Sequence, residues 1–134
     1  MGRYVMAEDY ARALRGSVII RREVDRALHG RDGLFLPALP IPAPRVGAAM
    51  VRVGTSEEPV RNVMLRCTQA FNVSGHPAIA LPCGETTEGL AIGAQIVGPR
   101  TGASALLPIA ADVEKILGVR QPVSATYLGP GTSR

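Results

Sequence analysis

The sequence is poor in aromatic residues and almost lacks lysine. It contains no tryptophan, two phenylalanines, three tyrosines and a single lysine, Lys115, among 134 residues. The net charge of +4 comes mainly from arginines that are spread along the whole chain. Nucleic-acid binding favours basic residues gathered on one face and aromatic rings that stack on bases. We therefore expect no nucleic-acid partner and interpret the arginines as scattered surface residues.

Long apolar runs are also missing. Arginine, glutamate or aspartate interrupts every run before the roughly 20 residues that a membrane-spanning helix needs, and the first residues lack the apolar core of a signal peptide. The sequence therefore predicts no membrane partner and a cytoplasmic location. The two cysteines, Cys67 and Cys83, offer one possible bridge, and without an export signal we expect free thiols.

What is present is typical of one globular domain. Hydrophobic residues make up 46% and charged residues 19% of the chain, which is ordinary for a folded protein. Apolar residues at helical spacing predict a helix over residues 7–28, a second from Glu57 to about Ala70, and a third over residues 103–117. Glycines after the first and third patterns are typical helix stops.

Short apolar runs predict the strands. We expect strands at 34–36, ending before Pro37, at 78–83 and at 92–97, with a marginal strand at 50–53. The run at 78–83 is uniformly apolar, so we interpret it as buried on both faces, and the polar residues of 71–77 as the loop that leads into it. The predicted fold is α/β, with a partial mixed sheet of about three or four strands and with helices. Three helices are too few to cover both faces of the sheet, so we expect the sheet to be incompletely covered.

One stretch is more distinctive than the rest. Phe71-Asn72-Val73-Ser74-Gly75-His76-Pro77 runs into Ala78-Ile79-Ala80-Leu81-Pro82-Cys83-Gly84. After it come Gly89, Leu90, Ile92, Gly93, Gln95, Ile96, Val97 and Gly98. This arrangement resembles the amidase signature family, in the part of the domain well downstream of the catalytic residues. Glu58-Pro59-Val60-Arg61 and Leu65-Arg66-Cys67-Thr68 extend the similarity towards the amino terminus.

The resemblance implies an enzyme of amide bonds whose reactive groups lie elsewhere. Family members use a serine nucleophile, a second serine held in a cis peptide and a lysine base, all in a glycine- and serine-rich segment that has no counterpart here. A lysine base must be buried beside a serine, whereas Lys115 follows Glu114 on a predicted surface helix. We therefore expect no catalytic residue in this chain. Leu65 replaces the acidic residue that transamidases of this family carry, which makes glutamyl-tRNA amidation the less favoured activity.

The functional hypotheses follow from this. The first is a carboxy-terminal amidase fragment, inactive alone, with residues 1–122 as the carboxy-terminal portion of the amidase domain and residues 123–134 as a flexible tail. Its expected partners are the missing amino-terminal part of the domain and, through the open sheet, a second copy of itself. The alternative is a non-catalytic α/β binding or interaction module that retains an acyl or amide pocket. A small basic nucleic-acid binder is the third and weakest hypothesis.

The predicted pocket residues are polar and lie where a helix ends and a loop meets a strand. They are Thr68, Gln69, Asn72 and Ser74. Asn72 and Ser74 have an alternative role in bonding the loop backbone, with Gly75 supplying a positive φ angle.

One histidine and the two cysteines raise other possibilities. His76 could act as an acid or base, but no carboxylate lies near it in sequence, so a structural role is favoured. Cys67, His76 and Cys83 do not match the compact spacing of a metal site. We expect no metal and no cofactor.

Overall fold

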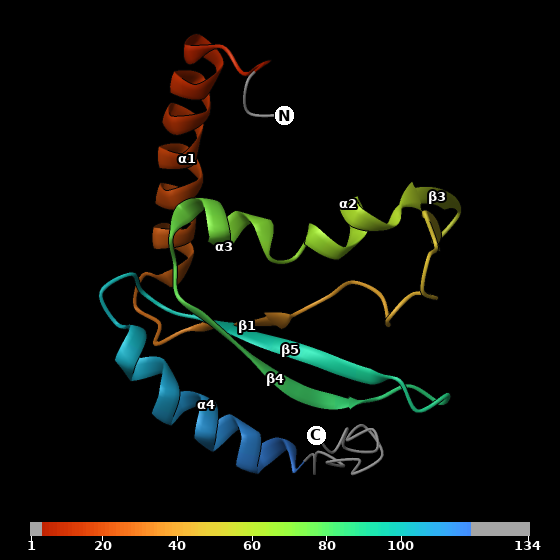
Figure 1. Ribbon diagram of the computed structural model, residues 1–134. Coiled ribbons are helices and arrows are strands. Elements are labelled where there is room, and N and C mark those ends of the chain that lie inside the picture. Colours follow the sequence, from red (N-terminus) through yellow and green to blue (C-terminus); the bar gives the residue numbers. More distant parts are fainter. Residues whose placement is uncertain (1–3, 119–134) are drawn as a thin grey trace, which may run out of the picture.

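The computed structural model describes residues 4–118 (Figure 1). A long helix opens the chain, a three-stranded sheet forms its centre, and a second long helix follows the sheet. The elements in order are α1 (Ala7–Leu28), β1 (Leu34–Pro37), β2 (Met50–Val53), β3 (Ser56–Pro59), α2 (Val60–Leu65), α3 (Gln69–Ser74), β4 (Ala78–Glu85), β5 (Ala91–Val97) and α4 (Ala103–Leu117).

The central sheet has the strand order β1-β5-β4, and β2 and β3 form a separate two-stranded hairpin. All of these strand pairs are antiparallel. Among residues 4–118, no parallel pair of the expected mixed sheet is present. Both outer strands carry proline, Pro37 in β1 and Pro82 in β4. Proline is tolerated there because an edge strand has amide positions that need no ladder partner. The α/β class and the partial sheet agree with the prediction.

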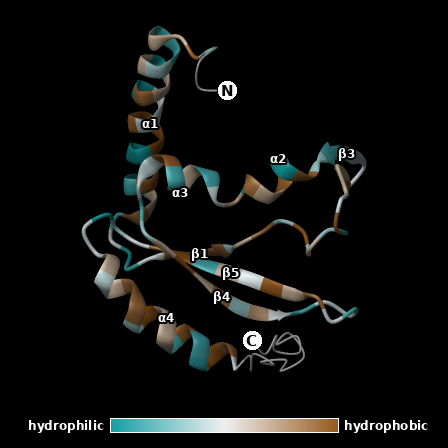
Figure 2. Cartoon of the chain, viewed as in Figure 1, coloured by the Kyte–Doolittle hydropathy of each residue, from teal (hydrophilic) through white to brown (hydrophobic). Residues whose placement is uncertain are grey.

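One face of the sheet is covered by α4. Ile79 lies opposite Ile96 in the β4–β5 ladder, and Leu81 lies opposite Ala94. Leu81 and Ile96 form a buried cluster with Leu106 and Ala110 of α4. Figure 2 shows that β5 and α4 both contain hydrophobic residues, coloured brown. Burial of these apolar side chains is the main contribution to the core.

The opposite face of the sheet lies towards α2 and α3, which cross above it in Figure 1. Gln95 is the central residue of this face, since it pairs with Leu36 on one side and Ala80 on the other. Helix α1 does not lie on the sheet: it packs against α3, and its buried residues, Val24 and Leu28, belong to its carboxy-terminal half. The amino-terminal half of α1 extends away from the other elements (Figure 1).

Three local predictions were wrong. Residues 56–59 form a strand rather than the start of a helix, because Glu57 lies directly opposite Arg52 and Glu58 opposite Val51 in the hairpin, and opposite charges across a ladder are favourable. The predicted helix to Ala70 is broken after Leu65. Residues 71–74, expected in a loop, form most of α3.

The predicted conformation of Gly75 is confirmed. It ends α3 with a φ of 76°, in the left-handed region, and its amide donates a hydrogen bond to the Phe71 carbonyl at 2.9 Å. Residues with a Cβ enter this region at a cost of about 1 kcal/mol or more. Glycine here lets the chain leave α3 and enter β4 within three residues.

The prediction that residues 78–83 are buried on both faces was also wrong. Ala78 and Ala80, which point away from α4, are exposed in the structure, whereas Leu81 on the α4 side is buried. Large apolar side chains elsewhere are exposed too, including Phe35 of β1 at 53% and Ile116 of α4 at 83%. Within residues 4–118 the sheet is therefore incompletely covered. The predicted tail, residues 123–134, lies outside the described residues.

Candidate functional site

A cavity of about 260 Å³ lies between α3 and the sheet face that α4 does not cover. Its apolar walls are alanines of the sheet region and the ring of Phe71. Its polar lining consists of Thr68, Asn72, His76 and Gln95, and the full set adds Ala38, Phe71, Ala78 and Ala80. An apolar pocket with a few converging polar groups is the usual form of a small-molecule site. No lining residue carries a carboxylate, a lysine or an arginine, so the cavity suits an uncharged group.

Gln95 fixes the floor of this cavity. The residue is 3% exposed, and its Nε2 donates to the Pro37 carbonyl at 3.0 Å and to the Cys67 carbonyl at 2.8 Å. The first bond holds the end of β1, and the second holds the turn between α2 and α3. Because two carbonyl oxygens face the same atom, that atom must be the amide nitrogen, and both of its hydrogens are used. Gln95 therefore sets the position of Thr68 by fixing the adjacent carbonyl.

His76 joins α1 to the end of α3. Its fully buried ring lies with Nδ1 2.8 Å from Ser74 Oγ and Nε2 3.1 Å from Asp25 Oδ1. Nearby, Arg21 of α1 donates from Nε to the Ser74 carbonyl at 3.0 Å. The order Asp25–His76–Ser74 is similar to that of a catalytic triad, but the Ser74 side chain is fully buried and also bonds the Phe71 carbonyl at 3.3 Å. A nucleophile must reach its substrate, so this arrangement is structural.

The structure brings two of the four predicted pocket residues to the cavity and places the other two outside it. Thr68 and Asn72 line the cavity. Gln69 is exposed at the start of α3, and Ser74 lies buried under His76, so neither is among the lining residues.

Sequence reasoning missed two features of the site. The carboxylate partner of His76 is Asp25, 51 residues away, and no local pattern reveals it. Gln95 was recognised only as part of the family resemblance. A polar residue inside an apolar strand was the available signal, since a buried amide must find partners.

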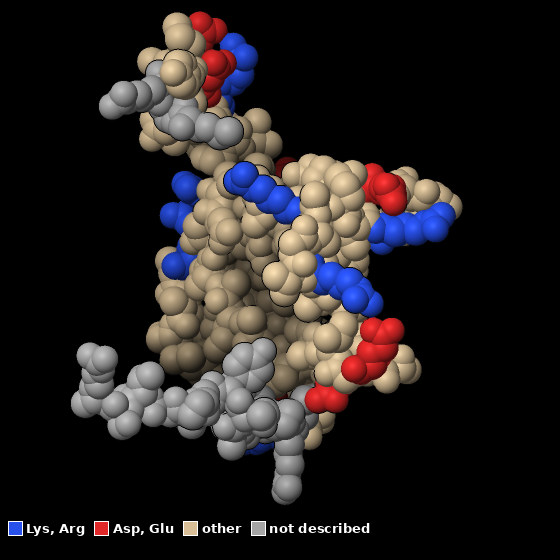
Figure 3. All heavy atoms as spheres, turned by 45° about the vertical axis from the view of Figure 1, so that its right-hand side comes forward, with Lys and Arg blue, Asp and Glu red and all other residues tan. Residues whose placement is uncertain are grey.

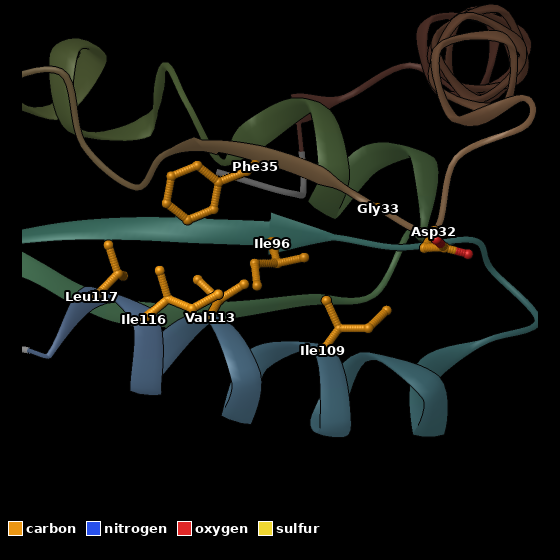
Figure 4. Close-up of a pocket in the computed structure, with 8 residues that line it drawn as sticks. All are labelled: Asp32, Gly33, Phe35, Ile96, Ile109, Val113, Ile116 and Leu117. Carbon is orange, nitrogen blue, oxygen red and sulfur yellow. The ribbon is translucent and has the colours of Figure 1, made fainter.

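A larger cavity of about 450 Å³ lies on the other side of the sheet, between β1 and α4 (Figure 4). Phe35 and Ile96 of the sheet face Ile109, Val113, Ile116 and Leu117 across it. Asp32 at its end is the one charged residue in its lining. Because polar groups do not converge here, it is a poorer candidate site and is better described as uncovered core.

Lys115 lies on the surface, as predicted, and the two cysteines are half-buried. The Lys115 side chain is 77% exposed on α4, and its Nζ lies 3.1 Å from Asp112 Oδ1. Cys67 and Cys83 are both free.

The surface charges, the possible metal ligands and the helix lengths complete the description of residues 4–118. The face in Figure 3 shows basic and acidic side chains side by side in several places. In residues 4–118, no group of three histidine, cysteine or acidic residues is arranged to hold a metal ion. No helix among these residues is long and apolar enough to cross a membrane.

Comparison with known proteins identifies the family. The family model described as Amidase matches residues 1–107. The chain belongs to the amidase family. It is 32% identical over 107 residues to a glutamyl-tRNA(Gln) amidotransferase subunit of Methanococcoides burtonii, and 39% identical over 95 residues to 6-aminohexanoate-cyclic-dimer hydrolase of Paenarthrobacter ureafaciens. These matches cover 79% and 66% of this chain.

Solved structures agree with the amidase fold. A crystal structure of an amidase superposes with a TM-score of 0.81 and 32% identity, covering 87% of this chain and 27% of that one. The structure of 6-aminohexanoate cyclic dimer hydrolase gives 0.74 and 33%, covering 89% of this chain and 27% of that one. The chain spans about a fifth of the length of the two curated relatives, 21% and 19%.

Proposed function

We propose that this chain is the carboxy-terminal scaffold of an amidase-family hydrolase of amide carbon–nitrogen bonds, and that it is inactive alone. The observation that carries the proposal is the position of Lys115, the only lysine of an amidase-family chain. A lysine becomes a base at neutral pH when burial disfavours its charged form. Lys115 is instead exposed and paired with Asp112, so the Ser–cisSer–Lys centre comes from polypeptide outside this chain.

The uncovered surfaces support a partner of the same domain. The groove beside Phe35 and the exposed hydrophobic residues of α1 leave apolar area in water, and exposed apolar patches often mark a contact surface. The relatives contain about four times as much additional chain as the segments that match this one. The proposed partner is the amino-terminal part of an amidase domain, and self-association through the same surfaces is the competing outcome.

The pocket assigned to this scaffold holds the acyl or amide part of the substrate. Thr68 and Asn72 line the cavity directly. Gln69 and Ser74 are the first and last residues of α3, and Ser74 holds His76 in place.

Reconstitution tests the proposal. The chain is co-expressed with the amino-terminal part of 6-aminohexanoate-cyclic-dimer hydrolase, ending where its similarity to this chain begins, and hydrolysis of the cyclic dimer is measured. We expect activity from the pair and none from either part. Loss of the contact surface by Phe35→Asp should abolish activity, whereas Val46→Asp, at an exposed position in the 38–49 segment, should not. Co-purification of the two parts without hydrolysis of the cyclic dimer would contradict the scaffold role.

The alternative, a binding module, is favoured by one observation: residues of this chain line a cavity in which several polar groups converge. A module needs no partner. Amide binding by the chain, together with failure of every reconstitution, would support this alternative over the first.

A further inference from the structure

The cavity under α3 has polar groups that can accept hydrogen bonds but few that can donate them. Both amide hydrogens of Gln95 are already donated, to Pro37 and Cys67. No donor to its Oε1 is found within residues 4–118. A buried oxygen in that situation would be unsatisfied, yet no buried side-chain oxygen or nitrogen lacks a partner among these residues. Oε1 is therefore not fully buried, and Gln95 is one of the residues that line the cavity.

The Thr68 hydroxyl can also accept a hydrogen bond in the cavity. Its hydroxyl hydrogen is directed to the Leu65 carbonyl at 3.5 Å, which leaves the oxygen lone pairs available in the cavity. His76 adds no free donor, because Ser74 and Asp25 engage both of its ring nitrogens. Asn72 is exposed at the rim and can turn either end of its amide inward.

We propose that Gln95 Oε1 and Thr68 Oγ1 form an acceptor pair that binds the N–H of a short aliphatic amide and rejects the corresponding carboxylate. A carboxylate brings no N–H to these two oxygen atoms, and the lining contains no cation to compensate its charge. The amide of a substrate would bind and the acid product would leave. The proposal rests on the proposed function in one respect: amides are tested because this family's named hydrolases act on them.

Ligand chemistry provides the test. The ¹⁵N-labelled full chain is titrated with butyramide, N,N-dimethylbutyramide and butyrate, and backbone amide shifts are followed by NMR. The dimethyl amide keeps the carbonyl but has no N–H. We expect butyramide to shift the Thr68, Asn72 and Ala80 signals and to bind at least tenfold more tightly than the other two. Equal binding of the three ligands, or no butyramide binding to a chain with a dispersed spectrum, would overturn the proposal.

Two alanines give matched variants. Ala80 lines the cavity, so Ala80→Leu should fill it and abolish butyramide binding. Ala111, on the exposed side of α4, should tolerate the same change with binding kept. Contacts between the butyramide methyl group and the Phe71 ring, measured by NOE in the unchanged chain, test the location without any variant. Binding at another site would overturn the assignment.

This result is separable from the proposed function. Butyramide selectivity without reconstituted hydrolysis would uphold the acceptor pair and contradict the scaffold role. Reconstituted hydrolysis without butyramide selectivity would uphold the scaffold role and contradict the acceptor pair.

Discussion

His76 provides the most quantitative prediction. His76→Leu keeps an apolar side chain of similar size in the buried site and removes both ring hydrogen bonds, to Ser74 Oγ at 2.8 Å and Asp25 Oδ1 at 3.1 Å. A buried neutral hydrogen bond contributes about 1 kcal/mol net. The bond to Asp25 contributes less, because that carboxylate is 53% exposed and solvent screens it. The docking of α1 on α3 should therefore weaken by about 1–1.4 kcal/mol, equivalent to about five- to tenfold more frequent opening.

Hydrogen exchange measures this opening directly. We expect amides in the last two turns of α1 and in α3 to exchange about five- to tenfold faster in His76→Leu, with amides of β5 unchanged, because only α1 and α3 share the network. Asp25→Ala should have a smaller effect in the parent and almost none in the His76→Leu background. Exchange within twofold of the parent, or an undiminished effect of Asp25→Ala in that background, would refute the reasoning.

Three further predictions follow from packing and charge. Gly98→Ala would place a Cβ 2.5 Å from Leu106 Cδ2 and 2.8 Å from its Cγ, so urea denaturation should show that the free energy of unfolding falls by about 1–3 kcal/mol. In the matched variant Gly16→Ala, the new Cβ meets nothing within 4 Å, and the free energy of unfolding should rise by about 0.5–1 kcal/mol because alanine favours the helix α1. Gly75→Ala should lose about 1 kcal/mol or more in the same assay because its φ of 76° disfavours a Cβ, and a neutral result would show that α3 ends differently. Lys115→Met should leave the turnover of the reconstituted enzyme within twofold, and a loss of a hundredfold would make this lysine the base.

The long elements could be predicted from sequence because their signals are local. Helices α1 and α4 have the predicted bounds, Ala7–Leu28 and Ala103–Leu117, since each combines a sustained apolar period with a glycine soon after its end. Residues 56–59 could not be assigned locally. Acidic residues before proline are equally typical of a helix start, and only pairing with the distant Met50–Val53 strand selects the extended form.

The site depended on contacts between distant segments. The break between α2 and α3 leaves the Cys67 carbonyl free to accept from Gln95, 28 residues later, and a helical period does not encode that requirement. Thr68 and Asn72 were predicted from a local signal, because they are polar residues between a helical pattern and an apolar strand pattern. Asp25 and Gln95 were not among the predicted site residues, because their roles exist only once α1 and β5 lie against the 67–76 segment.

The central claim is that this polypeptide holds substrate for a reactive centre located elsewhere. The most direct measurement is amide hydrolysis by the purified chain alone, using butyramide and an aryl anilide with ammonia or aniline release as the readout. We predict a rate equal to the uncatalysed background at every chain concentration. A rate proportional to chain concentration and abolished by replacing one of its serines would contradict the claim.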